Sequence, residues 1–91
     1  MNKIIEPSKK FIKHYRKRIR PHKNLRTKFE SRLILFQRNK SNPLLKDHQL
    51  RGTQKDKRSF SITGDVRVVY KEYKNYYLLL DVGTHNQVYY N

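Results

Sequence analysis

The stretch SFSITGDVRVVY, residues 59–70, decides the fold of this chain. β-Branched and aromatic residues fill both of its arms, and residues 63–65 (Thr-Gly-Asp) are typical of a tight turn, so the stretch predicts a β-hairpin. A three-residue loop pairs Ile62 with Val66, whereas a two-residue loop would shift the register by one and bury the serines. We favour the longer loop. The apolar side chains then share one face: Phe60, Ile62, Val66, Val68 and Tyr70.

The opposite face of this hairpin carries polar groups beside an arginine. Its residues are Ser59, Ser61, Arg67, Val69 and Lys71. An arginine held in mid-strand among small hydroxyl groups is suited to bind phosphate, because its guanidinium is a fixed fork of donors. The structural alternative is a cross-strand ion pair between Arg67 and an acidic residue such as Asp81.

Charge dominates the composition. The chain, which we interpret as one domain (residues 1–91), has a net charge of +15. Such a charge indicates a polyanionic partner, either nucleic acid or an acidic protein. Residues 1–46 carry 15 Lys and Arg against 2 acidic residues, and residues 47–91 carry 7 against 5. The N-terminal half therefore supplies the positive field, and the C-terminal half supplies the more specific polar chemistry.

The composition also excludes several classes of protein. There is no cysteine, hence no disulfide framework and no cysteine-based metal site. The four histidines lack metal-ligand spacing, so we expect no metal and no other cofactor. No apolar run is long enough to cross a bilayer, and the N-terminus lacks a signal-peptide core. We expect a cytoplasmic protein with no membrane partner.

Two amphipathic helices are predicted before the hairpin. A short strand at residues 3–5 ends at Pro7, and Ser8 is suited to cap the helix that follows. This helix ends near Pro21, and a second runs from about residue 22 to residue 38. Their apolar stripes are Phe11, Ile12, Tyr15 and Ile19 in the first helix, and Leu25, Phe29, Leu33 and Phe36 in the second.

The first helix lies in a strongly basic run. From Lys9 to Lys28 there are ten Lys and Arg and no acidic residue. Part of this run is a solvated helix face, and we expect His14 and His22 to be surface residues. Because like charges repel, and soluble helices usually mix both signs, the run also indicates a polyanion-binding surface. The RNA-binding candidates in it are Lys9, Lys10, Lys13, Arg16, Lys17 and Arg20.

The segments on either side of the hairpin complete the predicted fold. In the connector 44–52, Leu45 and Leu50 reach the core and hold Asp47 and His48 at the surface. A second hairpin with a three-residue loop pairs Tyr73 with Tyr77, Tyr70 with Leu80, Val68 with Val82 and Arg67 with Gly83. Residues 88–90 then form a short strand or an extended tail.

The element order β-α-α-β-β-β predicts an α+β protein, with two N-terminal helices packed on one face of a small, mostly antiparallel sheet. We expect the other face of the sheet to be open. Ser61 and Arg67 line this open face, and His48 and His85 lie at its rim.

Four motifs follow one another in the second half: LxDHxLxG (45–52), Arg58, DxRxVY (65–70) and GTHxxxY (83–89). In this order and separation they resemble the YafQ branch of the RelE/ParE toxin superfamily. The resemblance covers residues 44–91, and over the helices it consists of the order and length of the elements. It implies a RelE-like toxin of a type II toxin–antitoxin system, neutralised by a cognate antitoxin. It further implies a metal-independent endoribonuclease that cleaves mRNA on the ribosome.

The resemblance also implies roles for particular residues. The positions at which YafQ-like toxins keep functional histidines, an aspartate and an aromatic residue are His48, Asp65, His85 and Tyr89. Arg67 falls where the related YoeB-like toxins keep a functional arginine. Ser61 is a departure, because YafQ-like enzymes often carry a further histidine there.

These residue types fit the cleavage of RNA by its own 2′-hydroxyl, which needs a base, an acid and a cation for the developing phosphorane charge. Our assignments are His48 or Asp65 as the base, His85 as the acid, Arg67 as the phosphate clamp, Tyr89 as a platform for a nucleobase or a proton donor, and Arg58 as a further RNA contact.

Structural and functional alternatives remain open from the sequence. His85 and Asp65 are also natural turn residues, His48 can pair with Asp47, and Tyr89 can pack in the core. One alternative function is a ParE-like toxin that inhibits gyrase without nuclease activity. Another is a non-catalytic, basic RNA-binding module. Two histidines beside one groove favour catalysis, since gyrase inhibition needs no acid or base.

Overall fold

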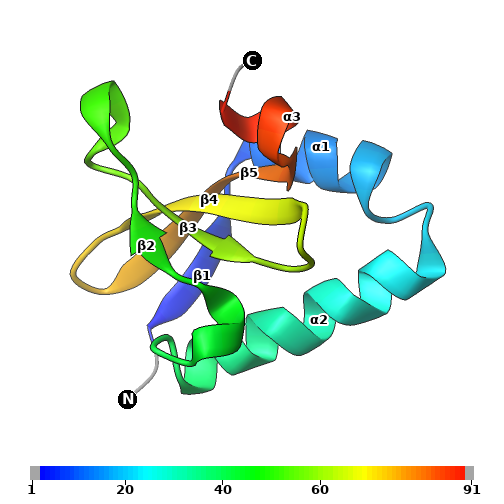
Figure 1. Ribbon diagram of the computed structural model, residues 1–91, viewed down its shortest axis with the longest axis horizontal. Coiled ribbons are helices and arrows are strands. Elements are labelled where there is room, and N and C mark those ends of the chain that lie inside the picture. The colour runs from blue at the N-terminus through cyan, green and yellow to red at the C-terminus, as the bar shows by residue number, and fades with distance from the viewer. Residues whose placement is uncertain (1–2, 90–91) are drawn as a thin grey trace.

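The computed structural model describes residues 3–89 and has an α+β fold, as predicted (Figure 1). One mixed sheet has the strand order β1-β5-β4-β3-β2, in which only the β1–β5 pair is parallel. The strands are β1 (Ile4–Pro7), β2 (His48–Gln49), β3 (Arg58–Ser61), β4 (Val66–Glu72) and β5 (Tyr76–Thr84). The α-helices are α1 (Lys9–Arg18), α2 (Lys23–Arg38) and α3 (His85–Tyr89), and two short 3₁₀ turns are η1 (Pro43–Leu45) and η2 (Gly52–Gln54).

The β3–β4 hairpin has the predicted register. Phe60 pairs with Val68, and the Ile62 N–H donates to the Val66 carbonyl at 2.8 Å. The loop between the two arms is therefore three residues long. The apolar face is buried as expected, and its fully buried members are Phe60, Ile62, Val68 and Tyr70.

The β4–β5 hairpin differs from the prediction at its turn. The Tyr73 N–H donates to the Tyr76 carbonyl at 2.9 Å, so the loop has two residues instead of three. A β-bulge then leaves Leu80 without a partner residue on β4, and this extra residue restores the register further along. The predicted pairs Tyr73–Tyr77 and Tyr70–Leu80 are wrong, whereas Val68–Val82 and Arg67–Gly83 are confirmed.

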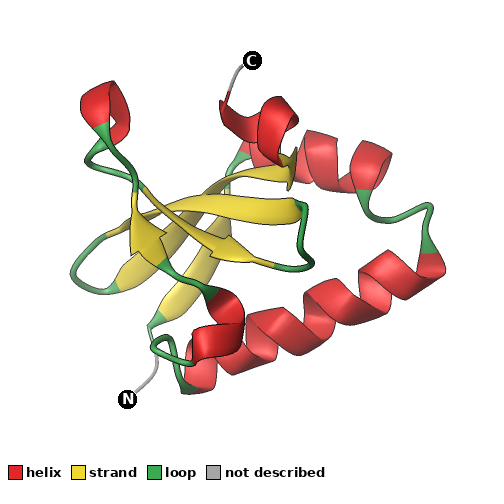
Figure 2. Ribbon diagram, viewed as in Figure 1, coloured by secondary structure: helices red, strands yellow, loops and turns green. Residues whose placement is uncertain are grey.

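The two long helices pack their apolar stripes against the apolar face of the sheet. Figure 2 shows the helices in red around the yellow strands. The Ser8 hydroxyl caps α1 as predicted, accepting a hydrogen bond from the Phe11 N–H at 3.0 Å. In α2, Phe36 stacks on Phe60 with ring centroids 4.4 Å apart. Ile12 differs from the predicted stripe, because it remains 36% exposed. Among the described residues, no helix is both long and apolar enough to cross a membrane.

The chain after β5 turns back as helix α3, so the predicted strand or tail at residues 88–90 is wrong for Val88 and Tyr89, while Tyr90 lies outside the described residues. The Thr84 N–H donates to Gln87 Oε1 at 2.8 Å, and the Gln87 N–H donates to Thr84 Oγ1 at 3.3 Å. This reciprocal pair is a capping box, which starts a helix by satisfying its first free N–H groups.

Helix α3 covers part of the sheet face that we expected to be open. The Tyr89 hydroxyl lies 2.7 Å from Ser59 Oγ. Ser59 is wholly buried, and Ser61 and Val69 are each at most 5% exposed. The prediction of an open face is therefore wrong for the part near Ser59, because a polar sheet face can be covered when its hydroxyl groups find hydrogen-bond partners.

Helix α1 is fixed to β5 by a buried carboxylate. Asp81 is 4% exposed, and its oxygens lie 2.5 Å from His14 Nδ1, 3.5 Å from Arg18 Nη1 and 3.6 Å from Lys10 Nζ. The three basic residues are spaced four apart, so they follow one side of the helix. His14 is therefore not the surface residue that we predicted. The ion pairs described for Asp81 are with α1, so Asp81 is not the cross-strand partner of Arg67.

Replacing this carboxylate is expected to destabilise the fold strongly. Asp81→Ala leaves three basic groups without their shared partner, and we expect the free energy of unfolding to fall by about 3 kcal/mol. Urea denaturation followed by circular dichroism measures this loss. Asp56→Ala is the control, because the Asp56 side chain is 54% exposed and pairs only with Lys71 among described residues. Equal effects of the two substitutions would show that Asp81 does not fix α1.

Candidate functional site

Three of the predicted catalytic residues line one hollow of about 410 Å³. Its lining residues are His48, Leu50, Arg51, Gln54, His85 and Tyr89. Because His48 pairs with Ser59 across β2 and β3, and Tyr89 bonds to Ser59, the hollow lies on the polar side of the sheet. Both histidines are exposed, and the ring centroids of His85 and Tyr89 are 4.5 Å apart, edge to face. Residues distant in sequence thus share one solvent-accessible site.

The ring of His48 has a defined orientation. Its Nδ1 lies 2.8 Å from the carbonyl oxygen of Lys46. A carbonyl oxygen can only accept a hydrogen bond, so Nδ1 carries the proton and Nε2 of the neutral ring is an acceptor. Lys46 has a positive φ of 48°, which turns the chain sharply before His48. This geometry suits His48 to take a proton at Nε2.

The side chain of Asp47, the residue before His48, points into the protein, whereas that of His48 is exposed. The Asp47 side chain is 6% exposed, so our prediction that it lies at the surface is wrong. Its Oδ1 accepts from the Tyr70 hydroxyl at 2.7 Å and from Arg58 Nε at 3.3 Å, and its Oδ2 lies 2.7 Å from Lys40 Nζ. Sequence reasoning missed this network, although the DH pair in the LxDHxLxG motif was a signal for it.

The network keeps its members in defined charge states. Burial raises the pKa of Tyr70, and the hydrogen bond and charge of Asp47 act in the same direction, so the phenol stays protonated. Burial works against the charge of Arg58, but its hydrogen bond to Tyr70 and the nearby Asp47 raise the pKa of its guanidinium. Nε of Arg58 is thus held by Asp47 and Tyr70. Arg58 is therefore part of a structural network and not only a surface residue that could contact RNA.

Arg67 lies on the same sheet face but is not among the residues that line the hollow. Its Nη1 donates to Ser61 Oγ at 3.3 Å, and its buried Nε has no hydrogen-bond partner among the described residues. Gly83 lies opposite on β5, where a Cβ would come within 2.6 Å of Gln87 Oε1 and 2.8 Å of Arg18 Nη1. The glycine of the GTH motif therefore allows close packing of α1 and α3 beside Arg67.

The structure separates Asp65 from the histidines' hollow. Asp65 is exposed in the β3–β4 turn and does not belong to the lining residues. Its backbone N–H donates to Thr63 Oγ1 at 3.2 Å, as does that of Val66 at 3.0 Å. This is the behaviour of a turn residue, so the geometry favours the structural alternative for Asp65.

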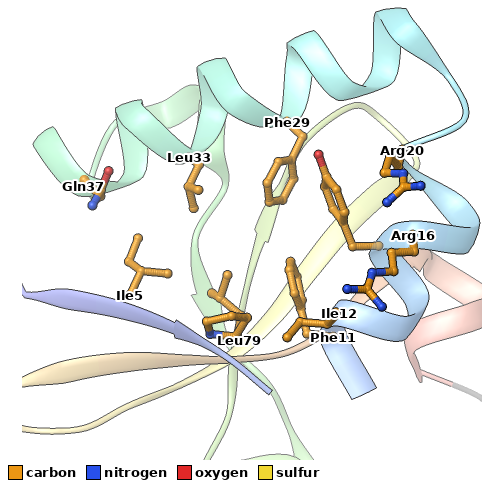
Figure 3. A pocket seen from close by; sticks show the side chains of 11 residues that line it. Ile5, Phe11, Ile12, Arg16, Arg20, Phe29, Leu33, Gln37 and Leu79 are labelled. Atoms are coloured by element: carbon orange, nitrogen blue, oxygen red, sulfur yellow. The ribbon is translucent and has the colours of Figure 1, made fainter. Parts of the chain in front are cut away.

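The basic residues of α1 spread over several surfaces. All six RNA-binding candidates, five in α1 and Arg20 just after it, are exposed, although Lys10 also pairs with Asp81. Arg16 and Arg20 border an apolar groove of about 440 Å³ between α1, α2 and β1 (Figure 3), whose lining residues include no histidine and no carboxylate. Lys17 lines a separate hollow of about 400 Å³ beside Thr84. The basic surface thus extends from the helix towards the C-terminal end of β5.

Within residues 3–89 there is no group of three or more His, Cys, Asp or Glu side chains that could hold a metal ion. The titratable side chains that line the hollow are two imidazoles, one phenol and the guanidinium of Arg51. The capping pair Thr84 and Gln87, which positions the start of α3 and thus His85, was also missed. Its signal was the T-x-x-Q spacing directly after the glycine.

Comparisons with known proteins identify the family. A family model described as bacterial toxin of type II toxin-antitoxin system, YafQ, matches residues 3–90. The fold is similar to that of YafQ from E. coli, with a TM-score of 0.79 and 24% identity over 96% of this chain and 98% of that chain. It is also similar to a chain of the E. coli DinJ-YafQ toxin-antitoxin complex, with a TM-score of 0.79 and 24% identity over 98% of this chain and 99% of that chain.

A metal-bound toxin from Helicobacter pylori is also similar, with a TM-score of 0.76 and 29% identity over 96% of this chain and 99% of that chain. No curated protein matches the sequence. The family model spans nearly the whole chain, and it agrees with the fold. The chain therefore belongs to the YafQ family of toxins from type II toxin–antitoxin systems.

Proposed function

We propose that this toxin is a ribosome-dependent endoribonuclease that cleaves mRNA through attack of the 2′-hydroxyl, without a metal ion. The observation that supports this most is the shared hollow of His48 and His85. General acid–base cleavage needs two proton-transfer groups on either side of one phosphodiester, and histidine suits both tasks near neutral pH. A hollow of about 410 Å³ is large enough for a ribose and its phosphate.

His48 is the better candidate for the base. Its Nδ1 is held by the Lys46 carbonyl, which leaves Nε2 to accept the proton of the 2′-hydroxyl. Asp65, the alternative base, lies in the exposed turn outside the hollow. His85 then serves as the acid for the 5′-oxygen. Tyr89, in edge contact with His85, offers its ring to a nucleobase or its hydroxyl as a donor.

Arg67 lies outside the lining of the hollow but on the same sheet face, and we assign it to the phosphorane as the cation nearby. Its buried Nε lacks a hydrogen-bond partner, and an unmet buried donor costs about 1–3 kcal/mol. Because Nε itself is buried, a phosphate would meet the part of the Arg67 side chain that is still exposed, where its negative charge lies next to the guanidinium. Nη1 of the same guanidinium donates to Ser61 Oγ at 3.3 Å.

The wider partners follow from charge and from the relatives. Lys9, Lys13 and Lys17 present an exposed positive surface to mRNA or ribosomal RNA, and Arg58 adds a further cation near β2. A cognate antitoxin is the expected protein partner, since the E. coli relative is found in a DinJ-YafQ complex. These partners imply a cytoplasmic site of action. Gyrase inhibition is the less favoured alternative, because it gives no reason for two histidines in one hollow.

The two histidines are expected to be essential for cleavage. His48→Ala and His85→Ala should each lower the cleavage rate by about 10²- to 10⁴-fold, because each removes one proton-transfer group. Primer extension on an mRNA, with and without ribosomes, measures the effect. Asn86→Ala is the matched control, since this exposed residue lies beside His85 on α3.

Each outcome of that experiment separates the competing functions. Cleavage only with ribosomes, lost in both histidine variants, agrees with the proposal. Full activity of both variants would contradict the catalytic assignment. No cleavage together with inhibition of gyrase would identify a ParE-like toxin instead.

The basic face of α1 is expected to control RNA affinity. Replacing Lys9, Lys13 and Lys17 by glutamine should weaken binding to ribosomes and reduce the slope of log K against log salt by about 0.7–0.9 for each lost phosphate contact. Lys74→Gln, in the exposed β4–β5 turn, is the control for a charge removed elsewhere. Filter binding over a salt series measures both quantities. Unchanged binding at low and high salt would show that α1 does not contact RNA.

A further inference from the structure

We propose that Asp47 is a positioning residue for His48, and that its buried carboxylate fixes the imidazole in the hollow through the chain turn at Lys46. This inference rests on the proposed function, in which His48 is the base. Asp47 does not line the hollow itself, so it would act on the reaction only through its neighbour.

The carboxylate is anchored from three separate elements. Lys40 follows α2, Arg58 begins β3 and Tyr70 lies in β4, and all three donors meet at Asp47. Tyr70 is fully buried, and its ring lies 4.9 Å from that of Phe36, edge to face. Buried polar networks whose members are all satisfied rigidify those members, so we expect Asp47 to be the best-fixed residue of this polar connector.

His48 has few other constraints on its backbone. Strand β2 has only two residues, which pair with Ser59 and Arg58. Consecutive residues of an extended chain point to opposite sides, so an inward Asp47 requires an outward His48. The same anchor holds the Lys46 carbonyl, with its positive φ, against Nδ1 of the imidazole. Release of Asp47 would therefore free both the direction of the ring and its tautomer.

Two substitutions weaken the anchor by different amounts. Asp47→Asn keeps an oxygen for the Tyr70 hydroxyl but loses the charge that binds Lys40 and Arg58. Tyr70→Phe removes only one hydroxyl and keeps the packed ring, so it tests the network even where the first variant fails to fold. Asp56→Asn, an exposed acid in the loop between β2 and β3, is the matched control.

The kinetic experiment uses ribosome-bound mRNA and separates kcat from KM. A misplaced base lowers kcat by about 10- to 100-fold in Asp47→Asn, and by a smaller factor in Tyr70→Phe, while KM stays within about twofold. Asp56→Asn keeps wild-type values. In a His48→Ala background, Asp47→Asn causes no further loss, because the residue through which it acts is already absent. A further loss in that background, or a loss carried by KM, would overturn the proposal.

A second readout does not need cleavage. Two-dimensional NMR of the imidazole nitrogens reports which ring nitrogen of His48 carries the proton. We expect the Nδ1–H form in the wild-type protein and a mixture with the Nε2–H form in Asp47→Asn. An unchanged tautomer in that variant would overturn the positioning role. A wild-type protein that cleaves no RNA would instead contradict the proposed function, and the NMR result would still decide whether Asp47 orients His48.

Discussion

The register of the β3–β4 hairpin is the constraint on which the rest of the structure depends. It places four side chains on the face that is buried by α1 and α2, namely Phe60, Ile62, Val68 and Tyr70. Each contributes about 1.5–3 kcal/mol when fully buried. A slip by one residue would exchange this face for one that carries Arg67 and two serines. The core and the polar face that carries the candidate site are thus two consequences of the same pairing.

Ser59 shows how this pairing reaches the site. Its backbone pairs with His48 of β2, and its hydroxyl lies 2.7 Å from the hydroxyl of Tyr89 in α3. The two elements that bear the histidines therefore meet at one fully buried residue of the hairpin. Asp47, the buried residue directly before β2, links the same short strand to the aromatic core through its hydrogen bond with Tyr70. Two buried residues thus support the elements that form the hollow: Ser59 contacts β2 and α3, and Asp47 fixes the connector before β2.

Much of the fold was predictable from the sequence, because the hairpin and the long helices depend on local patterns of apolar and polar residues. The alternation of apolar and polar residues predicted the β3–β4 hairpin and its buried face. Apolar residues at helical spacing predicted both long helices, and Ser8 was recognisable as the cap of the first. The two-residue turn with its bulge was not predictable, since the extra residue at Leu80 restores the same pairs that a longer loop would give. Asp47 was misplaced because an acidic residue is normally exposed, and its burial depends on donors from three distant elements. Helix α3 has too few residues to show a periodic stripe.

The most direct test of the central claim is the chemistry of the cleaved link. If His48 and His85 act on a phosphodiester that is attacked by its neighbouring hydroxyl, a single 2′-deoxy substitution at the cleaved nucleotide of a ribosome-bound mRNA abolishes cleavage but preserves binding. The unmodified mRNA then yields a 2′,3′-cyclic phosphate and a 5′-hydroxyl end. Cleavage of the deoxy substrate at the normal rate, or a 5′-phosphate product, would contradict the account.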